Sequence, residues 1–245
     1  MSRPAERIWI IGASRGIGAA LARLYAARGA RLILSARSAA GLAQIAAEAG
    51  GAEVIALDIS DPASLAEAAR RVAEGGPLDR AINLAGVMEA RRAGEASADA
   101  AARCIAINLS GSVDFTREAL PLLRPGGQLA LTGSLAAYIG LPEAQPYGAT
   151  KAAIVNYAQT LAAEQRGRAD IRVINPGFVD TDMTKDKDFP MPFLLRADQT
   201  AAAIARGLDG RRFEIAFPLP LLFGVRLLAA LPYWASLPII RRLKP

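Results

Sequence analysis

Tyr147 and Lys151 are the two residues whose types and spacing most directly suggest chemistry. Residues four apart on a helix share a face, so the lysine ammonium would lie close to the phenol. A positive charge there favours the phenolate, and moving a phenol pKa from about 10 to about 7 takes about 4 kcal/mol. Such a tyrosine could exchange a proton with a substrate oxygen at neutral pH. The alternative is a helix-surface pair without a chemical role.

The composition of the 245-residue chain excludes several other kinds of function. It contains no histidine, which removes Ser-His and Cys-His catalysis and argues against a metal site such as zinc. Its net charge of +6 comes from scattered arginines rather than a basic run with aromatics, so we expect no nucleic-acid partner. Cys104 is the only cysteine, so no internal disulfide can form and a reducing, cytoplasmic location is expected. The short polar start, residues 1–7, is unlike a signal peptide.

A glycine-rich turn follows the first strand-like segment. Residues 8–11 form a short apolar run typical of a buried parallel strand, and residues 19–27 have an amphipathic helical pattern. Between them, Gly12, Gly16 and Gly18 have the spacing Gly-x-x-x-Gly-x-Gly. This arrangement presents backbone N–H groups and a helix N-terminus to a pyrophosphate, so it predicts dinucleotide binding. An ordinary glycine-rich turn is the alternative.

The residues after the second predicted strand, 31–35, indicate which dinucleotide would bind. An acidic residue at this place binds a ribose 2′-hydroxyl, whereas an arginine accommodates a 2′-phosphate. This chain has Ala36 followed by Arg37, and Arg15 of the glycine turn is also available. The pattern favours NADPH over NADH, unless Arg37 is simply a solvated loop residue.

Strand-like and helical segments alternate along the chain and predict the α/β class. The expected architecture is a Rossmann-like, doubly wound parallel sheet in a single domain, with an apolar C-terminal extension. We expect residues 1–210 to form the dinucleotide-binding and catalytic Rossmann domain, and residues 211–245 to contain a last strand and an apolar tail. The further predicted strands are residues 53–57, 79–84, 128–132, 171–175 and 212–217. Ligands of such sheets bind at the carboxyl ends of the strands.

Two stretches interrupt this regular pattern. A long helical region from residue 97 to about residue 123 breaks near Asn108 and Gly111, and asparagine is a poor residue inside a helix. The break is either an accident of packing or a place where Asn108 reaches the site. Residues 182–196 are irregular and predict a mobile loop over the site.

Together these motifs resemble the short-chain dehydrogenase/reductase family, in its NADP(H)-type form, over residues 8–208. The residues that carry the resemblance are the glycine turn, Asp58, Asn83-Leu84-Ala85-Gly86, Asn108, Ser134, Tyr147 with Lys151, and Pro176-Gly177. The resemblance implies that Tyr147 is the general acid/base and that Ser134 hydrogen-bonds the substrate oxygen. It also implies that Lys151 holds the nicotinamide ribose and lowers the tyrosine pKa, and that Asn108 anchors a water in a proton relay.

The remaining implied roles concern the cofactor. The glycines would cradle the pyrophosphate, Asp58 and Ile59 would lie near the adenine, and Val179 and Thr181 would contact the carboxamide end. The full set of expected cofactor-binding residues is Gly12, Ser14, Arg15, Gly16, Ile17, Gly18, Arg37, Asp58, Ile59, Asn83, Ala85, Gly86, Tyr147, Lys151, Pro176, Gly177, Val179 and Thr181.

The chain departs from the family pattern at three places. Ile11 replaces the threonine that usually precedes the first glycine, and Leu84 replaces the second asparagine of the usual Asn-Asn-Ala-Gly. We expect both changes to have small effects on strand packing or hydrogen bonding. The family's usual last strand is absent, and residues 212–245 take its place. This puts the family's common tetramer in doubt, and we expect a homodimer.

The apolar tail, residues 219–240, is broken by three prolines and contains Arg226. A membrane span needs about 20 apolar residues in one helix, so the tail is not transmembrane. Three interpretations stay open: packing on the protein's own surface or a dimer partner, an interfacial membrane anchor, or a wall of an apolar substrate pocket. We expect the first half to pack, with Arg226 directed to solvent or a carboxylate. The half beyond Pro232, with Tyr233, Trp234 and terminal basic residues, would be the membrane-facing part.

The sequence therefore predicts an NADPH-dependent oxidoreductase that reduces a ketone or aldehyde, or oxidises a secondary alcohol, on an apolar substrate. The alternative is a catalytically idle NADP(H)-binding scaffold or redox sensor. A sensor would have no need of Asn108, Ser134, Tyr147 and Lys151 together. The expected partners are a small-molecule carbonyl or alcohol and a second copy of the chain, with peripheral contact at the inner face of a membrane left open.

Overall fold

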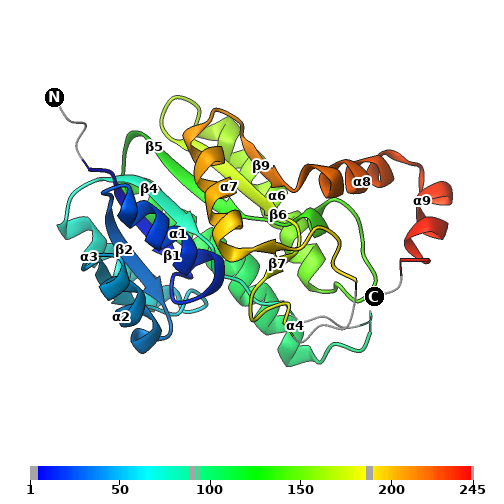
Figure 1. Cartoon of the computed structure of the whole chain (residues 1–245), viewed down its shortest axis with the longest axis horizontal. Coiled ribbons are helices and arrows are strands. Elements are labelled where there is room, and N and C mark those ends of the chain that lie inside the picture. The colour runs from blue at the N-terminus through cyan, green and yellow to red at the C-terminus, as the bar shows by residue number, and fades with distance from the viewer. Residues whose placement is uncertain (1–4, 89–91, 93, 186–189, 244–245) are drawn as a thin grey trace.

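The chain folds as a three-layer α/β/α structure with a parallel sheet in the middle (Figure 1). The computed structural model describes residues 5–88, 92, 94–185 and 190–243. Within these residues the main sheet has seven parallel strands in the order β3-β2-β1-β4-β5-β6-β9. Because β2 and β3 extend from one side of β1 and the later strands from the other, the sheet is doubly wound, as the sequence predicts.

The strands of the main sheet are close to the apolar runs that predict them. They are β1 (Arg7–Ile11), β2 (Arg31–Ala36), β3 (Glu53–Ala56), β4 (Leu78–Asn83), β5 (Leu123–Thr132), β6 (Asp170–Pro176) and β9 (Glu214–Phe217). The largest difference is β5, which begins five residues before the predicted position. Its extra residues include a proline and two glycines, which are poor strand formers, but Leu123 pairs with Leu78 of β4 across an irregularity in the ladder.

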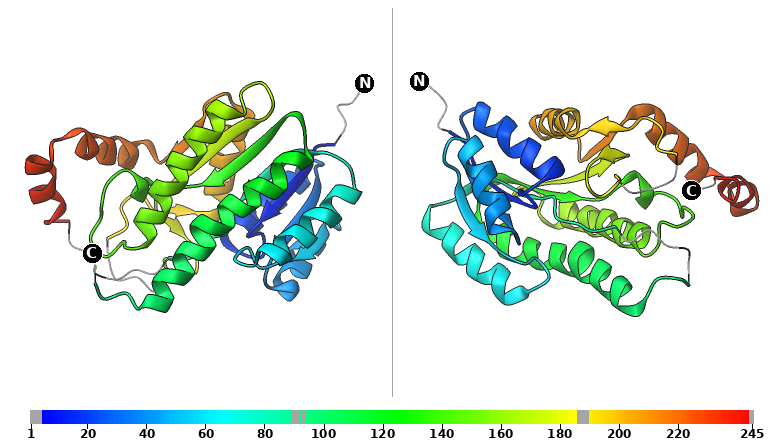
Figure 2. Two further views of the ribbon diagram at one scale, coloured as in Figure 1. Left: turned by 180° about the vertical axis from the view of Figure 1, so that it is seen from behind. Right: turned by 60° about the horizontal axis from the view of Figure 1, so that its bottom comes forward.

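Helices cover both faces of the sheet. They are α1 (Gly16–Ala27), α2 (Ala39–Glu48), α3 (Pro62–Glu74), α4 (Ala98–Ile105), the π-helical turn η1 (Ala106–Ser110), α5 (Gly111–Ala119), the 3-10 turns η2 (Leu120–Leu122) and η3 (Leu135–Ala137), α6 (Tyr147–Glu164) and α7 (Ala197–Asp209). Figure 2 shows the two helical layers on opposite sides of the strands. The interrupted helix that the sequence predicts is therefore α4 and α5 joined by a π-helical turn.

Alternating side chains of the strands divide the core in two, as expected for strands buried on both faces. Trp9 of β1 points into the core with α3, α5 and α6, where its ring meets Phe115 edge-on at 5.4 Å between centroids. Its neighbours Ile8 and Ile10 point into the other core, with α1, α2 and α7. Each layer of helices thus closes one apolar face of the sheet.

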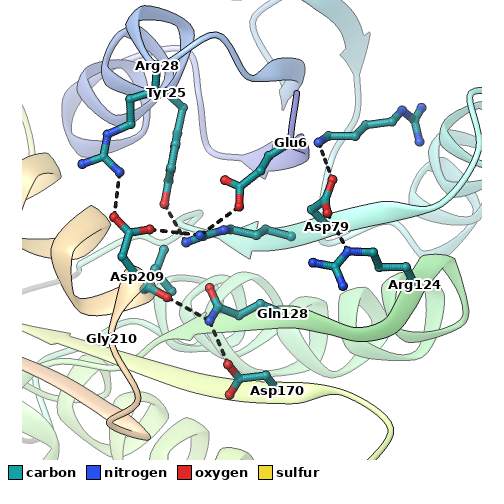
Figure 3. A network of polar contacts seen from close by, with 12 residues as sticks. Glu6, Tyr25, Arg28, Asp79, Arg124, Gln128, Asp170, Asp209 and Gly210 are labelled. Carbon is teal, nitrogen blue, oxygen red and sulfur yellow. Dashed lines mark hydrogen bonds and ion pairs between the residues drawn. The ribbon is translucent and has the colours of Figure 1, made fainter. Parts of the chain in front are cut away.

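A polar network secures the edge of the sheet at the amino ends of the strands (Figure 3). Arg80 of β4 donates hydrogen bonds to Glu6 at 3.2 Å and to Asp209 of α7 at 3.0 Å. It also donates to the Tyr25 hydroxyl of α1 at 3.2 Å, and burial raises the pKa of that hydroxyl to about 12. The network joins α1 and α7 to the sheet at the edge opposite the carboxyl ends of the strands, which leaves those ends for a site.

The segments after β6 differ in part from the sequence prediction. The predicted loop 182–196 includes a short strand, β8 (Leu195–Arg196), which pairs with β7 (Val179–Asp180) in a small second sheet. Residues 186–189 of that loop lie outside the described residues. The tail forms two helices, α8 (Leu219–Ala230) and α9 (Tyr233–Ile240). None of the described helices is both long and apolar enough to span a bilayer.

The two halves of the tail are placed differently. Leu222 and Val225 of α8 are buried against Leu135 and Tyr138, so this half packs on the protein's own body, as predicted. Arg226 forms an ion pair with Glu214, which is the carboxylate expected for it. Helix α9 lies further out, beyond the end of α8 (Figures 1 and 2).

Candidate active site

A cleft of about 470 Å³ lies at the carboxyl ends of β1, β2, β3 and β4. Many of the predicted cofactor-binding residues line it: Gly12, Ser14, Arg15, Gly16, Ile17, Gly18, Arg37, Asp58, Ile59, Ala85, Gly86 and Thr181. Asn83, Tyr147, Lys151, Pro176, Gly177 and Val179 are not part of its lining. The structure therefore brings the glycine turn, Arg37 and the end of β4 together around one cavity.

The glycine turn leaves no room for side chains at two of its positions. Gly12 has φ +83°, and a Cβ there would lie 2.8 Å from the backbone of Leu84 and Ala85. A Cβ on Gly18 would lie 2.1 Å from the carbonyl oxygen of Gly12, so α1 can approach the turn only without one. These contacts produce the close-packed backbone cradle that a pyrophosphate needs.

The first turn of α1 has the features of an anion site. Its N-cap residue Arg15 makes no side-chain capping bond, and the first turn contains no acidic residue. The N–H groups at this end and the helix dipole therefore favour a negatively charged group. They face the same cleft as the glycines, so the residues present fit the pyrophosphate of a dinucleotide.

Charged residues line the part of the cleft where the sequence predicts recognition of the cofactor's 2′-position. Ala36 and Arg37 line the cleft together, and Arg37 is exposed. Arg15 is held by an exposed ion pair with Asp182, at 3.2 Å. Asp58 lies nearby; burial alone would raise its pKa, but hydrogen bonds from Ser60 and the charge of Arg37 lower it. This carboxylate is thus already engaged by Ser60, through both its N–H and its hydroxyl.

Tyr147, Ser134 and Lys151 meet beside the end of the cleft. Tyr147 is the first residue of α6, and its hydroxyl forms a hydrogen bond with Ser134. Lys151 lies one turn later, with its Nζ 5.6 Å from the centre of the tyrosine ring. Nζ donates to the carbonyl oxygen of Thr132 at 2.8 Å and lies 3.5 Å from where a Cβ of Gly86 would be. Because Gly86 lines the cleft, the three side chains adjoin its end.

The pKa values at this pair follow burial rather than the expected charge effect. Burial raises the pKa of Tyr147, and the hydrogen bond with Ser134 offsets this only in part. Burial also lowers the pKa of Lys151 to about 8. Burial therefore governs the pKa of Tyr147 in this structure, and the lowering of that pKa by Lys151 stays a prediction. The phenol is thus protonated at neutral pH and can act as a proton donor.

Asn108 explains the break in the long helix. It lies in the π-helical turn η1, a feature often found at functional sites. Its side-chain amide forms two hydrogen bonds with the backbone of Val87. The Asn108 Oδ1 accepts from the Val87 N–H, and Nδ2 donates to the Val87 carbonyl, each at 2.9 Å. It also donates to the Thr150 hydroxyl on α6 at 3.1 Å. Asn108 therefore fixes the segment after Gly86 against the helix that contains Tyr147 and Lys151.

The end of β4 is fixed by similar contacts. The Asn83 side chain accepts from the Ala85 N–H and donates to the Ser112 hydroxyl, both at 3.0 Å. The two family departures lie here, and the Leu84 N–H donates to the Ile11 carbonyl at 2.9 Å. Both replaced positions thus keep the pairing of β1 with β4, in line with the small effects expected.

The residues after β6 reach the site from a third direction. Val179 is buried, and Thr181 approaches the glycine turn, 3.3 Å from where a Cβ of Gly16 would be. Gly177 packs under Leu221 of α8. Ser38, Gly41, Val87 and Met183 also line the cleft, although the sequence does not predict them there. Of these residues, only Ser38 has a pattern that the sequence could have shown, because serine is a preferred N-cap residue. It caps α2 by accepting from the Gly41 N–H at 3.1 Å.

The comparisons with known proteins agree with this geometry. Residues 6–190 match the family model described as short chain dehydrogenase. An uncharacterized oxidoreductase of Myxococcus xanthus is 31% identical over 232 residues, which are 91% of each chain. The 11-beta-hydroxysteroid dehydrogenase 1A of Arabidopsis thaliana is 34% identical over 194 residues, 74% of this chain and 54% of that enzyme. The chain thus spans about half the length of that relative.

A solved structure has the same fold over most of the chain. An alcohol dehydrogenase from the archaeon Thermococcus sibiricus, complexed with 5-hydroxy-NADP, has a TM-score of 0.78 and 33% identity, covering 87% of this chain and 96% of that chain. The fold and the matches define an oxidoreductase of the NAD(P)(H)-using class. The chain belongs to the short-chain dehydrogenase family.

Proposed function

We propose that the protein is an NADPH-dependent oxidoreductase that reduces a ketone or aldehyde, or oxidises the corresponding alcohol, with a preference for apolar substrates. The observation that carries this proposal is the meeting of Tyr147, Ser134 and Lys151 beside the cleft that the glycine turn lines. A neutral phenol in that position has the proton that a carbonyl oxygen must gain on reduction.

We expect the cofactor to lie in one orientation along the proposed binding residues. The glycine turn would hold the pyrophosphate, Asp58 and Ile59 the adenine end, and Asn83 to Gly86 the middle. Pro176, Gly177, Val179 and Thr181 would hold the nicotinamide end. When bound, the nicotinamide supplies a hydride to the carbonyl carbon or takes one from the alcohol.

The protein's own residues would handle the proton. Ser134 and Tyr147 would both hydrogen-bond the substrate oxygen, and Tyr147 would pass its proton to that oxygen. The ammonium of Lys151 would stabilise the phenolate that remains. Asn108 would keep Val87, Thr150 and hence α6 in place, and its proposed part in a water relay remains a prediction.

The preference for NADPH is supported by Ala36 and Arg37 at the rim of the cleft. The solved relative from T. sibiricus is complexed with an NADP derivative, which agrees with it. A preference for apolar substrates is supported by Leu135 and Leu221, which lie beside Ser134 and Gly177. We assign cofactor binding and catalysis to residues 1–210 and the last strand and tail to residues 211–245.

We also propose that the protein is a cytoplasmic homodimer. Light scattering on the purified protein would measure its mass, and cell fractionation would locate it. A tetramer would contradict the assembly, because the family's usual last strand is replaced here.

The central experiment is a panel of ketones, aldehydes and secondary alcohols, followed by NADPH absorbance. We expect turnover with at least one apolar carbonyl, and its loss in Tyr147→Phe with NADPH binding retained. If the protein binds NADPH but turns over no substrate of the panel, and Tyr147→Phe leaves NADPH binding unchanged, the idle scaffold is favoured instead.

A further inference from the structure

The two tail helices expose a large apolar surface that the main body does not cover. One side of α8 is buried through Leu222 and Val225. Leu219, Phe223 and Leu227 recur every four residues on the opposite side, and Phe223 and Leu227 are each 67% exposed. On α9, Tyr233 and Trp234 are 81% and 80% exposed. Exposed clusters of this kind usually mark a surface that binds a partner.

The side chains of this surface are those found where protein meets lipid. Tryptophan and tyrosine have an apolar ring with a polar end, and both concentrate at the boundary between water and hydrocarbon. They stand next to Leu237 on α9, with Phe223 and Leu227 on α8 supplying aliphatic and aromatic area. Helices with such composition lie in the plane of a bilayer surface rather than crossing it.

The charge of the tail indicates which kind of partner its exposed apolar surface binds. The sequence contains no aspartate or glutamate after Glu214, whereas Arg226, Arg241 and Arg242 are present. Arg226 is paired with Glu214, but Arg241 and Arg242 are exposed beside the apolar surface. Two copies of this tail would bring like charges together, while an anionic lipid surface would balance them.

We propose that the α8–α9 surface (Leu219, Phe223, Leu227, Tyr233, Trp234 and Leu237) docks on the surface of a bilayer that contains anionic lipid. The tail leaves the body directly after β9, at the carboxyl edge of the sheet (Figure 1). Leu221 of α8 contacts Gly177 beside the candidate site, so docking brings that edge of the molecule toward the lipid. The proposal concerns binding, and it stands whether or not the proposed reaction is correct.

The two tryptophans allow a direct measurement on the full-length protein. Trp9 is fully buried in the core, whereas Trp234 is almost fully exposed. Vesicles of mixed phosphatidylglycerol and phosphatidylcholine should therefore shift the emission of Trp234 to shorter wavelength and leave Trp9 unchanged. A Trp9→Phe variant isolates this signal. Co-sedimentation with the same vesicles gives an independent affinity.

We expect binding to the mixed vesicles, much weaker binding to pure phosphatidylcholine, and loss of binding as salt shortens the screening length. Phe223→Ser with Leu227→Ser should weaken binding at least tenfold. Arg241→Glu with Arg242→Glu should weaken it further on anionic vesicles only, by at least about fivefold for each arginine. Ile105→Ser, an exposed apolar residue on α4, is the matched control and should bind normally.

Two results would overturn the proposal. One is failure of the full-length protein to bind anionic vesicles at low salt. The other is equal binding by the Phe223/Leu227 variant and the control. If the same variant instead converts a dimer into a monomer without any vesicle binding, the surface belongs to a second copy of the chain. Near-ultraviolet circular dichroism of each variant verifies that the fold is retained.

Discussion

Replacing Arg37 by alanine should weaken NADPH binding about tenfold and leave NADH binding nearly unchanged. Arg37 lines the cleft next to Ala36, where a 2′-phosphate would lie. A hydrogen bond between charged groups contributes about 1.5–3 kcal/mol, and the exposure of Arg37 favours the lower end. About 1.4 kcal/mol corresponds to tenfold in affinity.

Adding Ala36→Asp should reverse the preference. A carboxylate about 4 Å from a phosphate of charge near −2 costs about 2 kcal/mol in water, or about 30-fold in affinity. The same carboxylate can accept a hydrogen bond from the 2′-hydroxyl of NADH. The double variant Ala36→Asp, Arg37→Ala should therefore bind NADPH roughly 300-fold more weakly than the parent and bind NADH more tightly than NADPH.

Arg15 gives a second, independent measure of the same recognition. Its ion pair with Asp182 is mostly exposed, with side chains 72% and 66% accessible, so breaking it costs at most about 1 kcal/mol. Arg15 can then turn to the phosphate at little cost. Asp182→Asn should release it and strengthen NADPH binding by up to about fivefold, without a comparable change for NADH.

Titrations followed by nicotinamide fluorescence measure the affinity of the parent and of each variant for NADPH and for NADH. The parent should bind NADPH at least tenfold more tightly than NADH. Arg70→Ala, an exposed arginine on α3 away from the cleft, is the control and should change neither affinity. Equal affinities of the parent for the two cofactors would refute the assignment, as would a loss in Arg37→Ala that is the same for both.

Tyr147, Lys151 and the Arg80 network at the amino ends of the strands lead to three more expected outcomes. Tyr147→Phe should lower turnover about 10²–10⁴-fold with NADPH binding retained, and near-normal steady-state rates would contradict its role as proton donor. With the Lys151 pKa near 8 and an unfolded lysine near ~10.4, the native state binds fewer protons between these values, so the free energy of unfolding should rise with pH across that window. Urea titrations should show this rise and its absence in Lys151→Met, whereas kcat/KM for reduction should fall above about pH 8. Arg80→Met should destabilise the fold by about 1–3 kcal/mol, because Glu6 and Asp209 lose their shared partner. Arg80→Lys should restore part of the loss, and an unchanged urea midpoint would show that the network contributes nothing.

The main sheet was predictable because each strand is an apolar run buried on both faces. The prediction failed where pairing depends on a partner rather than on the segment itself. Residues 123–127 of β5 include a proline and two glycines, which are poor strand formers, yet Leu123 pairs with Leu78. β7 and β8 are two residues each, too short for any periodic signal.

The sequence predicts which residues come together in the candidate site, but it does not predict their pKa values. Helical spacing places Tyr147 and Lys151 together, and the structure has them on one face of α6. The direction of the tyrosine pKa depends on how much water the fold removes from the phenol, which local sequence does not contain. Likewise, Asn108 was recognised as a break in a helix, but its contacts with Val87 and Thr150 are known only from the fold.

Glu214 shows why the unusual tail is part of the architecture of the site. This carboxylate accepts hydrogen bonds from Tyr138, from Asn175 of β6 at 2.7 Å, and from Arg226 of α8. Burial raises the pKa of Glu214, and the charge of Arg226 opposes that rise.

The same cluster reaches the turn that contains the candidate catalytic serine. A Cβ on Gly133 would lie only 2.1 Å from the Asn175 Oδ1, so this amide packs directly against the residue before Ser134. One carboxylate thus joins the end of β6, the turn after Ser134 and the first tail helix. The position of α8 is therefore fixed by groups that also support Ser134, while α9, beyond Pro232, extends past them with its aromatic residues exposed. The contacts of Glu214 thus hold the outer side of α8 in a fixed relation to the site.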